Sequence, residues 1–139
     1  MIAVIRDLPL ERAADAVALW QECGLTRPWN DPHDDLIRAM DGPSSTVLAA
    51  VDGDALAGTA MVGHDGHRGW VYYLAVRPDR RRAGVGRELM QASEQWLIQR
   101  EVPKLNLMVR TTNASVIAFY ETLGYGDGQV TVLGKLLRR

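Results

Sequence analysis

The chain has 139 residues, of which 16 are basic and 17 acidic, giving a formal charge of −1. This length predicts a single domain, residues 1–139, that buries enough surface to fold without staples. The single cysteine, Cys23, excludes an internal disulfide framework and a cysteine-based zinc site. No apolar run reaches the roughly 18 residues of a membrane span, and the near-neutral charge disfavours a general nucleic-acid-binding protein.

The first part of the chain predicts one strand and two helices. Ile2–Arg6 is a short apolar strand with no basic segment before it, so we expect no signal peptide and a cytoplasmic protein. Asp7 is predicted to cap a helix whose apolar residues recur at helical spacing and which Gly24 ends. A polar loop is expected over Gly24–Asp35, followed by a short helix at Asp34–Met40.

The middle of the chain predicts three strands. Thr46–Val51 and Ala55–His64 flank Asp52-Gly53-Asp54, a sequence typical of a hairpin turn. After a second turn, Trp70–Val76 is apolar on both faces, as expected of a buried central strand. Pro78 ends this strand because proline cannot donate to a ladder.

The last part predicts a helix at Gly84–Glu101, a strand at Leu105–Val109, a helix at Asn113–Leu123 capped by Gly124, and a final strand at Val130–Leu137. The order is β-α-α-β-β-β-α-β-α-β. It indicates a mixed α/β fold with a central, mostly antiparallel sheet and about four flanking helices.

The basic residues are 14 Arg and only 2 Lys, and five of the arginines fall within eleven positions. They are Arg77, Arg80, Arg81, Arg82 and Arg87. The cluster surrounds Gly84-Val85-Gly86, where a strand leads into a helix. Glycines let a phosphate approach the N–H groups of a helix N-terminus, and arginine adds donors, so the turn suits a pyrophosphate. Taken alone, a solvated basic loop explains the turn equally well.

Two separate motifs together resemble the GNAT family of N-acetyltransferases. Arg81-Arg82-Ala83-Gly84-Val85-Gly86 is similar to the family's R/Q-x-x-G-x-G/A signature, and Leu74-Ala75-Val76 with Pro78 to the strand end before it. Asn113 through Phe119-Tyr120-Glu121-Thr122-Leu123-Gly124-Tyr125 resembles the family's closing helix. Element order and length match over essentially the whole chain. Three further segments resemble the small YpeA-type bacterial branch, namely Arg27-Pro28-Trp29-Asn30-Asp31-Pro32, Asp65-Gly66-His67-Arg68-Gly69 and Leu133-Gly134-Lys135.

This resemblance implies transfer of an acetyl group from acetyl-CoA to a primary amine by direct attack on the thioester, without a metal. The backbone of the glycine turn would hold the CoA pyrophosphate, and the preceding strand, splayed from the next, would pair with pantetheine. An amide N–H near Val76 would polarise the thioester carbonyl. The residues implied to bind CoA are Leu74, Ala75, Val76, Arg81, Arg82, Gly84, Val85, Gly86 and Asn113.

The resemblance also gives Tyr120 the role of general acid that protonates the departing thiolate. A phenol with a pKa of about 10 keeps its proton at neutral pH. From helical spacing alone, Tyr120 lies on the same side as Val116 and Leu123 and would belong to the core. The motif match reverses that preference.

The acceptor side is less well defined, because Trp70–Val76 carries no carboxylate to act as a base. The candidates for the base are a water chain or one of His64, Asp65, His67, Asp31, His33 and Asp34. These polar turns are better explained as solvated loops than as a metal site. The acceptor is expected to contact Trp29, Asp31 and His64, although Trp29 would equally serve to anchor its loop. Acidic groups nearby favour a cationic acceptor, either a small molecule or a peptide amine.

An alternative function is a catalytically silent CoA-binding sensor or partner-binding module of the same fold. A nucleic-acid module that uses the arginine cluster is disfavoured by the neutral charge and the lack of interleaved aromatic residues. We expect no nucleic-acid or membrane partner, and either a monomer or a homodimer.

Overall fold

The computed structural model describes residues 3–137, so Ile2 of the first predicted strand lies outside the described residues. The chain divides into two compact units, Met1–Met108 and Val109–Arg139. The single domain 1–139 therefore stays a prediction. None of the helices in the described part of the chain is long and apolar enough to cross a membrane.

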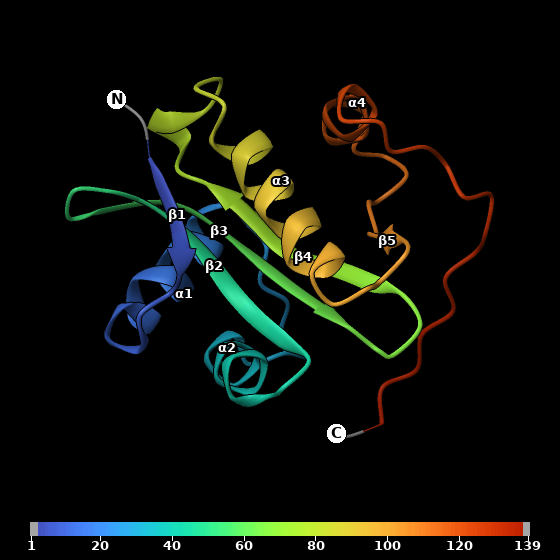
Figure 1. Cartoon of the computed structure of the whole chain (residues 1–139), viewed down its shortest axis with the longest axis horizontal. Coiled ribbons are helices and arrows are strands. Elements are labelled where there is room, and N and C mark those ends of the chain that lie inside the picture. The colour runs from blue at the N-terminus through green and yellow to red at the C-terminus, as the bar shows by residue number, and fades with distance from the viewer. Residues whose placement is uncertain (1–2, 138–139) are drawn as a thin grey trace. The chain divides into compact units, whose positions relative to one another are not determined.

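The first unit is built on a five-stranded sheet in the order β1-β2-β3-β4-β5 (Figure 1). The first four strands pair antiparallel, and β5 pairs parallel with β4. The mostly antiparallel mixed sheet expected from the sequence is confirmed. The strands are β1 (Val4–Asp7), β2 (Ser45–Asp52), β3 (Ala55–His64), β4 (Gly69–Val76) and β5 (Leu105–Asn106).

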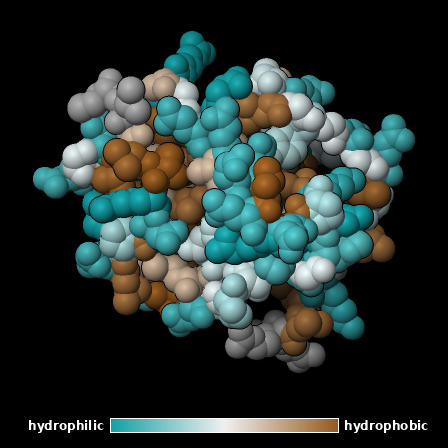
Figure 2. Space-filling model, viewed as in Figure 1, coloured by the Kyte–Doolittle hydropathy of each residue, from teal (hydrophilic) through white to brown (hydrophobic). Residues whose placement is uncertain are grey.

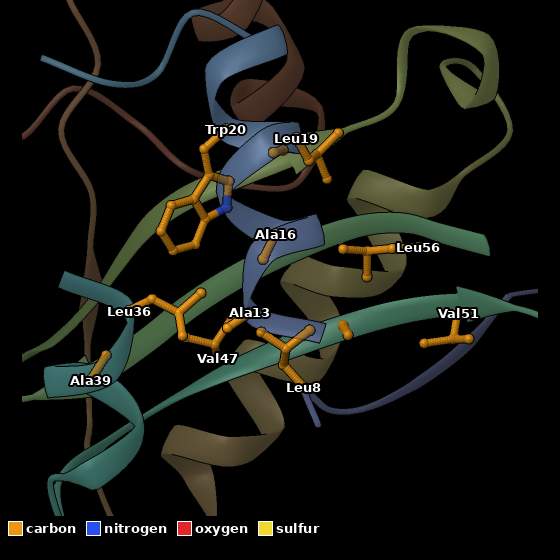
Figure 3. Close-up of a cluster of buried hydrophobic side chains, with 12 residues drawn as sticks. Leu8, Ala13, Ala16, Leu19, Trp20, Leu36, Ala39, Val47, Val51 and Leu56 are labelled. Atoms are coloured by element: carbon orange, nitrogen blue, oxygen red, sulfur yellow. The ribbon is translucent and has the colours of Figure 1, made fainter. Parts of the chain in front are cut away.

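Helices cover both faces of this sheet. On one face, α1 (Ala13–Glu22) and α2 (Pro32–Asp41) pack their apolar sides on alternate residues of β2, from Val47 to Val51, and on Leu56 of β3. On the other face lies α3 (Val85–Ile98), which Figure 3 draws behind the strands while α1 crosses in front of them. The approach of α3 is close, because a Cβ at Gly58 would meet Leu89 at 3.0 Å.

The core between the sheet and α1–α2 is centred on Trp20, which is fully buried (Figure 3). Leu36 of α2 and Val47 of β2 are also fully buried in this cluster. Burial of each such apolar side chain stabilises the fold by about 1.5–3 kcal/mol. The face seen in Figure 2 carries further apolar side chains scattered among hydrophilic ones, as is usual for protein surfaces.

A bulge interrupts β4 at Tyr73. Thr59 of β3 pairs with Ala75, but Met61 pairs with Tyr72, so two residues of β4 oppose one of β3. Tyr73 has a φ of 51°, in the left-handed region. The buried Thr59 hydroxyl ties the bulge to α1, because it accepts a hydrogen bond from Trp20 Nε1 (2.8 Å) and donates one to the Tyr73 carbonyl (3.0 Å).

The helix ends agree with the sequence in two places. Gly24 follows α1 with a φ of 70°, and Gly124 follows α4 (Ala114–Thr122) of the second unit with a φ of 94°. After Gly124, the Tyr125 N–H donates to the Tyr120 carbonyl (3.1 Å), as in a Schellman motif. Both predicted glycine caps are therefore confirmed.

Three predicted elements differ from the structure. Asp7 belongs to β1 and caps no helix; Pro9 precedes a short 3₁₀ turn, Leu10–Arg12, that leads into α1. The strand predicted at 105–109 is only two residues long. Residues 130–137 form no strand, and their apolar side chains, such as Leu133, are exposed. A strand exists only where a ladder partner exists, and none pairs with this segment within residues 3–137.

The hydrogen bond from Trp20 to Thr59 yields a stability prediction. Thr59→Val keeps the shape of the side chain but leaves the buried indole N–H without a partner, which should lower the free energy of unfolding by about 1–3 kcal/mol. Thr59→Ser, which retains the hydroxyl, should cost less than Thr59→Val. Urea unfolding of the two variants measures the difference. Equal stabilities of Thr59→Val and the wild type would contradict this role.

Candidate active site

The edge of β4 that faces β5 is open along most of its length. β5 pairs with β4 only at Gly69 and Trp70, and no other strand among residues 3–137 pairs with this edge. The Arg77 N–H points toward β3, where it donates to the Ala57 carbonyl (2.8 Å). Backbone N–H and C=O groups of successive residues in a strand point to opposite edges, so those of Val76 point to the open edge. An extended ligand can add to such an edge as an extra strand.

A turn with two left-handed residues connects this strand to α3. After the 3₁₀ turn Pro78–Arg80, Arg82 has a φ of 66° and Gly84 a φ of 85°. Gly84 is the N-cap of α3 and no side chain caps the helix. The first intrahelical bond runs from Glu88 to Gly84 (3.0 Å), so the three N–H groups in between have no partner within the helix. These N–H groups and the positive end of the helix dipole form a place for an anion.

The five clustered arginines divide into two groups. Arg77 pairs with Asp79 (2.8 Å), and Arg80 pairs with the buried carboxylate of Asp52. The other three, Arg81, Arg82 and Arg87, form no ion pair within the described part of the chain and are exposed.

One of the unpaired arginines, Arg81, stays close to the open strand edge. Its Nε lies 3.4 Å from the Val76 carbonyl oxygen. Arg81 Nη2 also lies 3.8 Å from Cys23 Sγ. Neither Arg81 nor Arg82 has a carboxylate partner among residues 3–137, so both positive charges are available to an anionic ligand.

Tyr120 lies near the end of α4 in the second unit and is buried, with 9% of its surface exposed. The ring makes edge contacts with Phe119 and Tyr125, at centroid distances of 5.1 and 5.8 Å. Burial raises the pKa of Tyr120 to about 12. The phenol is therefore fully protonated at neutral pH. Asn113 is exposed at the N-cap position of the same helix, and its side chain does not cap the helix.

A cavity of about 400 Å³ opens beside β4. Its lining comes from the loop before α2, from α2 itself and from the β3–β4 hairpin. The polar and aromatic side chains that line it include Asn30, Asp35, His64, Asp65, Trp70 and Tyr72. Trp70, Tyr72 and Tyr73 of β4 line the cavity, so the cavity and the open edge share one strand.

On the α2 side of the cavity, the Asp35 carboxylate interacts with three other side chains. Its carboxylate accepts hydrogen bonds from the Tyr73 hydroxyl (2.8 Å) and Asn30 Nδ2 (3.0 Å), and it pairs with Arg38 (2.8 Å). Tyr73 also stacks on Trp20 at a centroid distance of 3.9 Å. Burial and the Asp35 carboxylate raise the pKa of Tyr73, so this phenol remains a hydrogen-bond donor.

The predicted acceptor residues have different positions in the structure. His64 lines the cavity, and its Nδ1 accepts from the Gly66 N–H (3.2 Å). Trp29 is 58% exposed and does not line the cavity. Asp31 is the N-cap of α2 and accepts hydrogen bonds from the N–H groups of His33 (2.9 Å) and Asp34 (3.2 Å). No group of three potential metal ligands occurs in the described residues.

Sequence reasoning did not find Asp35, Tyr72 or Tyr73 as cavity residues. Asp35 lies one turn after the Asp31 cap, on the side of α2 that carries the buried Leu36 and Ala39. This helical spacing in the sequence indicates that Asp35 faces the interior. The two tyrosines belong to Trp70–Val76, a stretch whose apolar pattern predicts a buried strand and does not indicate a cavity. The bulge at Tyr73, which brings both rings to the cavity, has no sequence signal.

Residues 14–125 match the model of the acetyltransferase (GNAT) family. An acetyltransferase of Yersinia enterocolitica is 44% identical over 123 residues, which cover 88% of this chain and 87% of that protein. An acetyltransferase of Yersinia pestis is 43% identical over 133 residues, which cover 96% and 94% of the two chains.

Solved structures share the fold. AAC(6')-Iy, in complex with the bisubstrate analogue CoA-S-monomethyl-acetylneamine, has a TM-score of 0.84 at 14% identity, covering 98% of this chain and 99% of the other. The ribosomal-protein-S18-alanine N-acetyltransferase of Escherichia coli has a TM-score of 0.76 at 24% identity, covering 92% and 80%. The mixed sheet with helices on both faces is therefore the fold of these acetyltransferase structures. The chain belongs to the GNAT family of acetyltransferases.

Proposed function

We propose that this protein transfers an acetyl group from acetyl-CoA to a primary amine that is bound in the cavity beside β4. The observation that carries the proposal is the open edge of β4, followed after the turn of residues 77–84 by the N-terminus of α3, which no side chain caps. One ligand that combines an extended amide-bearing arm with a pyrophosphate satisfies both features, and CoA has this combination.

In this proposal, the pantetheine arm pairs with the edge of β4 at Leu74, Ala75 and Val76. The pyrophosphate then lies on the turn, where Gly84, Val85 and Gly86 offer backbone N–H groups without obstructing side chains. A Cβ at Gly84 would meet nothing within 4 Å, so the space in front of the turn is open. The complex of AAC(6')-Iy with a CoA-containing analogue supports this assignment by likeness of fold.

Arg81 and Arg82 add charge beside the proposed phosphates, because neither is tied to a carboxylate within residues 3–137. Arg77 and Arg80 have carboxylate partners and therefore serve the structure of the turn. Asn113 of the second unit is proposed to contact the pantetheine arm.

The chemical step needs few protein groups. The neutral amine attacks the thioester carbonyl carbon, and the Val76 N–H on the open edge stabilises the developing oxyanion. The C–S bond then breaks, the new amide nitrogen loses a proton to solvent, and the sulfur receives a proton from Tyr120. A free thiol has a pKa near 8.5, so full transfer from a phenol with a pKa of about 12 is uphill. In this proposal, Tyr120 therefore transfers its proton to the sulfur while the C–S bond breaks. Water then protonates Tyr120 again.

The acceptor is proposed to be a small molecule. A cavity of about 400 Å³ falls within the range of roughly 300–1,000 Å³ typical of small-molecule sites. Among the structures of the same fold, an aminoglycoside acetyltransferase from a soil metagenomic sample is in complex with sisomicin, with a TM-score of 0.83 at 15% identity over 99% of this chain and 97% of that one.

Gly86→Val tests the proposed phosphate site. A branched side chain in the first turn of α3 would obstruct the N–H groups, so CoA should no longer raise the melting temperature. Gln91→Val is the matched control, because it places the same side chain at an exposed position of the same helix. Thermal unfolding with and without CoA measures the effect. A folded Gly86→Val protein with wild-type stabilisation by CoA would contradict the site.

Tyr120→Phe tests the general acid. Loss of the hydroxyl should lower kcat by about 10²- to 10⁴-fold, the usual range for removal of a proton donor, and should leave CoA affinity nearly unchanged. Thiol release from acetyl-CoA measured over a panel of amines gives the rates. Because the pKa of Tyr120 is about 12, the wild-type rate should show no loss from its ionisation below about pH 11.

Two results would count against this account in different ways. Wild-type turnover by Tyr120→Phe would remove the proton-donor role. CoA binding without turnover of any amine would favour the silent CoA-binding module instead.

A further inference from the structure

One wall of the cavity combines a carboxylate with two aromatic rings. Asp65, in the turn between β3 and β4, accepts hydrogen bonds from the backbone N–H groups of His67 (2.9 Å) and Arg68 (2.8 Å). Its second oxygen accepts from Trp70 Nε1 (3.2 Å). Trp70 and Tyr72 are two residues apart on β4, and their rings lie nearly parallel with centroids 6.5 Å apart.

Asp65 is exposed at the rim of the cavity, and its carboxylate is ionised at neutral pH. The hydrogen bonds from Arg68 and His67, together with that from Trp70, lower the pKa of Asp65 to about 2. Within residues 3–137 Asp65 forms no ion pair. The neighbouring Arg68 guanidinium instead donates to the His67 carbonyl (3.2 Å). The cavity therefore contains a fixed negative charge without a cationic partner.

The second carboxylate of the cavity is different. Asp35 is neutralised by Arg38 and accepts hydrogen bonds from Tyr73 and Asn30. Its charge and most of its acceptor capacity are therefore already used by the protein. Asp65 remains as the group of the cavity that can compensate the charge of a ligand.

The rings beside Asp65 favour the same kind of ligand. The face of a tryptophan or tyrosine attracts a cation through the quadrupole of the ring, and the attraction increases when the cation loses water. Tyr72 is 43% exposed although it is a large aromatic residue. Trp70 is held in place by its bond to Asp65. A carboxylate and two ring faces together form a site for an ammonium group.

This ammonium group is not the amine that reacts. A nearby carboxylate stabilises the charged form of an amine and raises its pKa, whereas attack on a thioester needs the neutral form. The wall formed by Asp65, Trp70 and Tyr72 is therefore suited to a second cation, at a distance from the nitrogen that is acetylated.

We propose that Asp65, Trp70 and Tyr72 bind a second, unreactive cationic group of the acceptor, so that the preferred acceptors are small molecules with at least two amino groups. The assignment of the reacting amine rests on the proposed function, but the binding of a cation at this wall does not. The size of the cavity, about 400 Å³, favours a small diamine over a folded protein as the acceptor.

The binding experiment uses a probe that cannot be acetylated. Titration calorimetry of the full chain compares pentyltrimethylammonium with its uncharged carbon isostere. The ammonium should bind more tightly, and Asp65→Asn and Tyr72→Leu should each weaken it by at least about threefold. Tyr72→Phe, which keeps a ring, should retain more affinity than Tyr72→Leu. Asp34→Asn is the matched control, because Asp34 is exposed on α2 and does not line the cavity.

The kinetic experiment compares pentylamine with the corresponding α,ω-diamine at saturating acetyl-CoA. The diamine should have a kcat/KM about tenfold higher, and Asp65→Asn should reduce this ratio toward one. If the ammonium probe binds as expected but neither amine is acetylated, the cation site stands and the proposed function fails.

Three results would overturn the cation site. The first is an uncharged isostere that binds as tightly as the ammonium. The second is a folded Asp65→Asn protein with wild-type affinity for the ammonium. The third is an Asp34→Asn protein whose affinity for the ammonium falls as much as that of Asp65→Asn. A lysine peptide with a higher kcat/KM than the diamine would overturn the assignment to small molecules.

Discussion

The candidate site depends on one constraint, namely that β4 has a ladder partner on both sides only at its first two residues. Beyond Trp70 the strand remains bonded to β3 but has no partner strand on the other edge within the described residues. The Val76 carbonyl accepts hydrogen bonds there from the side chains of Cys23 and Arg81. Backbone N–H and C=O groups need partners, and an open edge invites pairing with another chain. In this protein the open edge ends at a glycine turn and a helix N-terminus, so a ligand with an extended arm and a phosphate group can occupy all of it.

The same strand also builds the cavity, because its bulge changes the direction of its side chains. The extra residue of the bulge has its carbonyl bound by Thr59, and the Tyr73 ring rests on Trp20. The Tyr73 hydroxyl reaches Asp35 on α2. Buried and half-buried hydrogen bonds thus connect α1, α2, β3 and β4, and residues of α2, β3 and β4 line the cavity.

Much of the fold could be predicted from the sequence, because local rules determine it. Glycines end α1 and α4, Asp52-Gly53-Asp54 marks the β2–β3 turn, and the arginine-glycine turn precedes α3. The rest depends on contacts between distant segments. Whether residues 130–137 form a strand depends on a partner, and whether Arg80 is free depends on Asp52, which lies 28 positions away.

The cavity was harder to predict than the arginine-glycine turn, because its lining residues come from segments that are distant in the sequence. The early loop contains several acidic residues, and sequence spacing did not show that Asp31 caps α2 while Asp35 faces the cavity. Asp65 was recognised only as one candidate base among six. Its environment, with two backbone donors and an indole N–H, is a property of the folded turn.

The most direct test of the account is amide hydrogen exchange along β4, measured by NMR with and without acetyl-CoA. The Val76 amide should exchange rapidly in the free protein and become protected when acetyl-CoA binds, because the thioester carbonyl would supply its missing partner. The Arg77 amide, already bonded to Ala57, should be protected in both states. If acetyl-CoA binds while the Val76 amide stays unprotected, the strand edge is not the site of the ligand and the central claim is wrong.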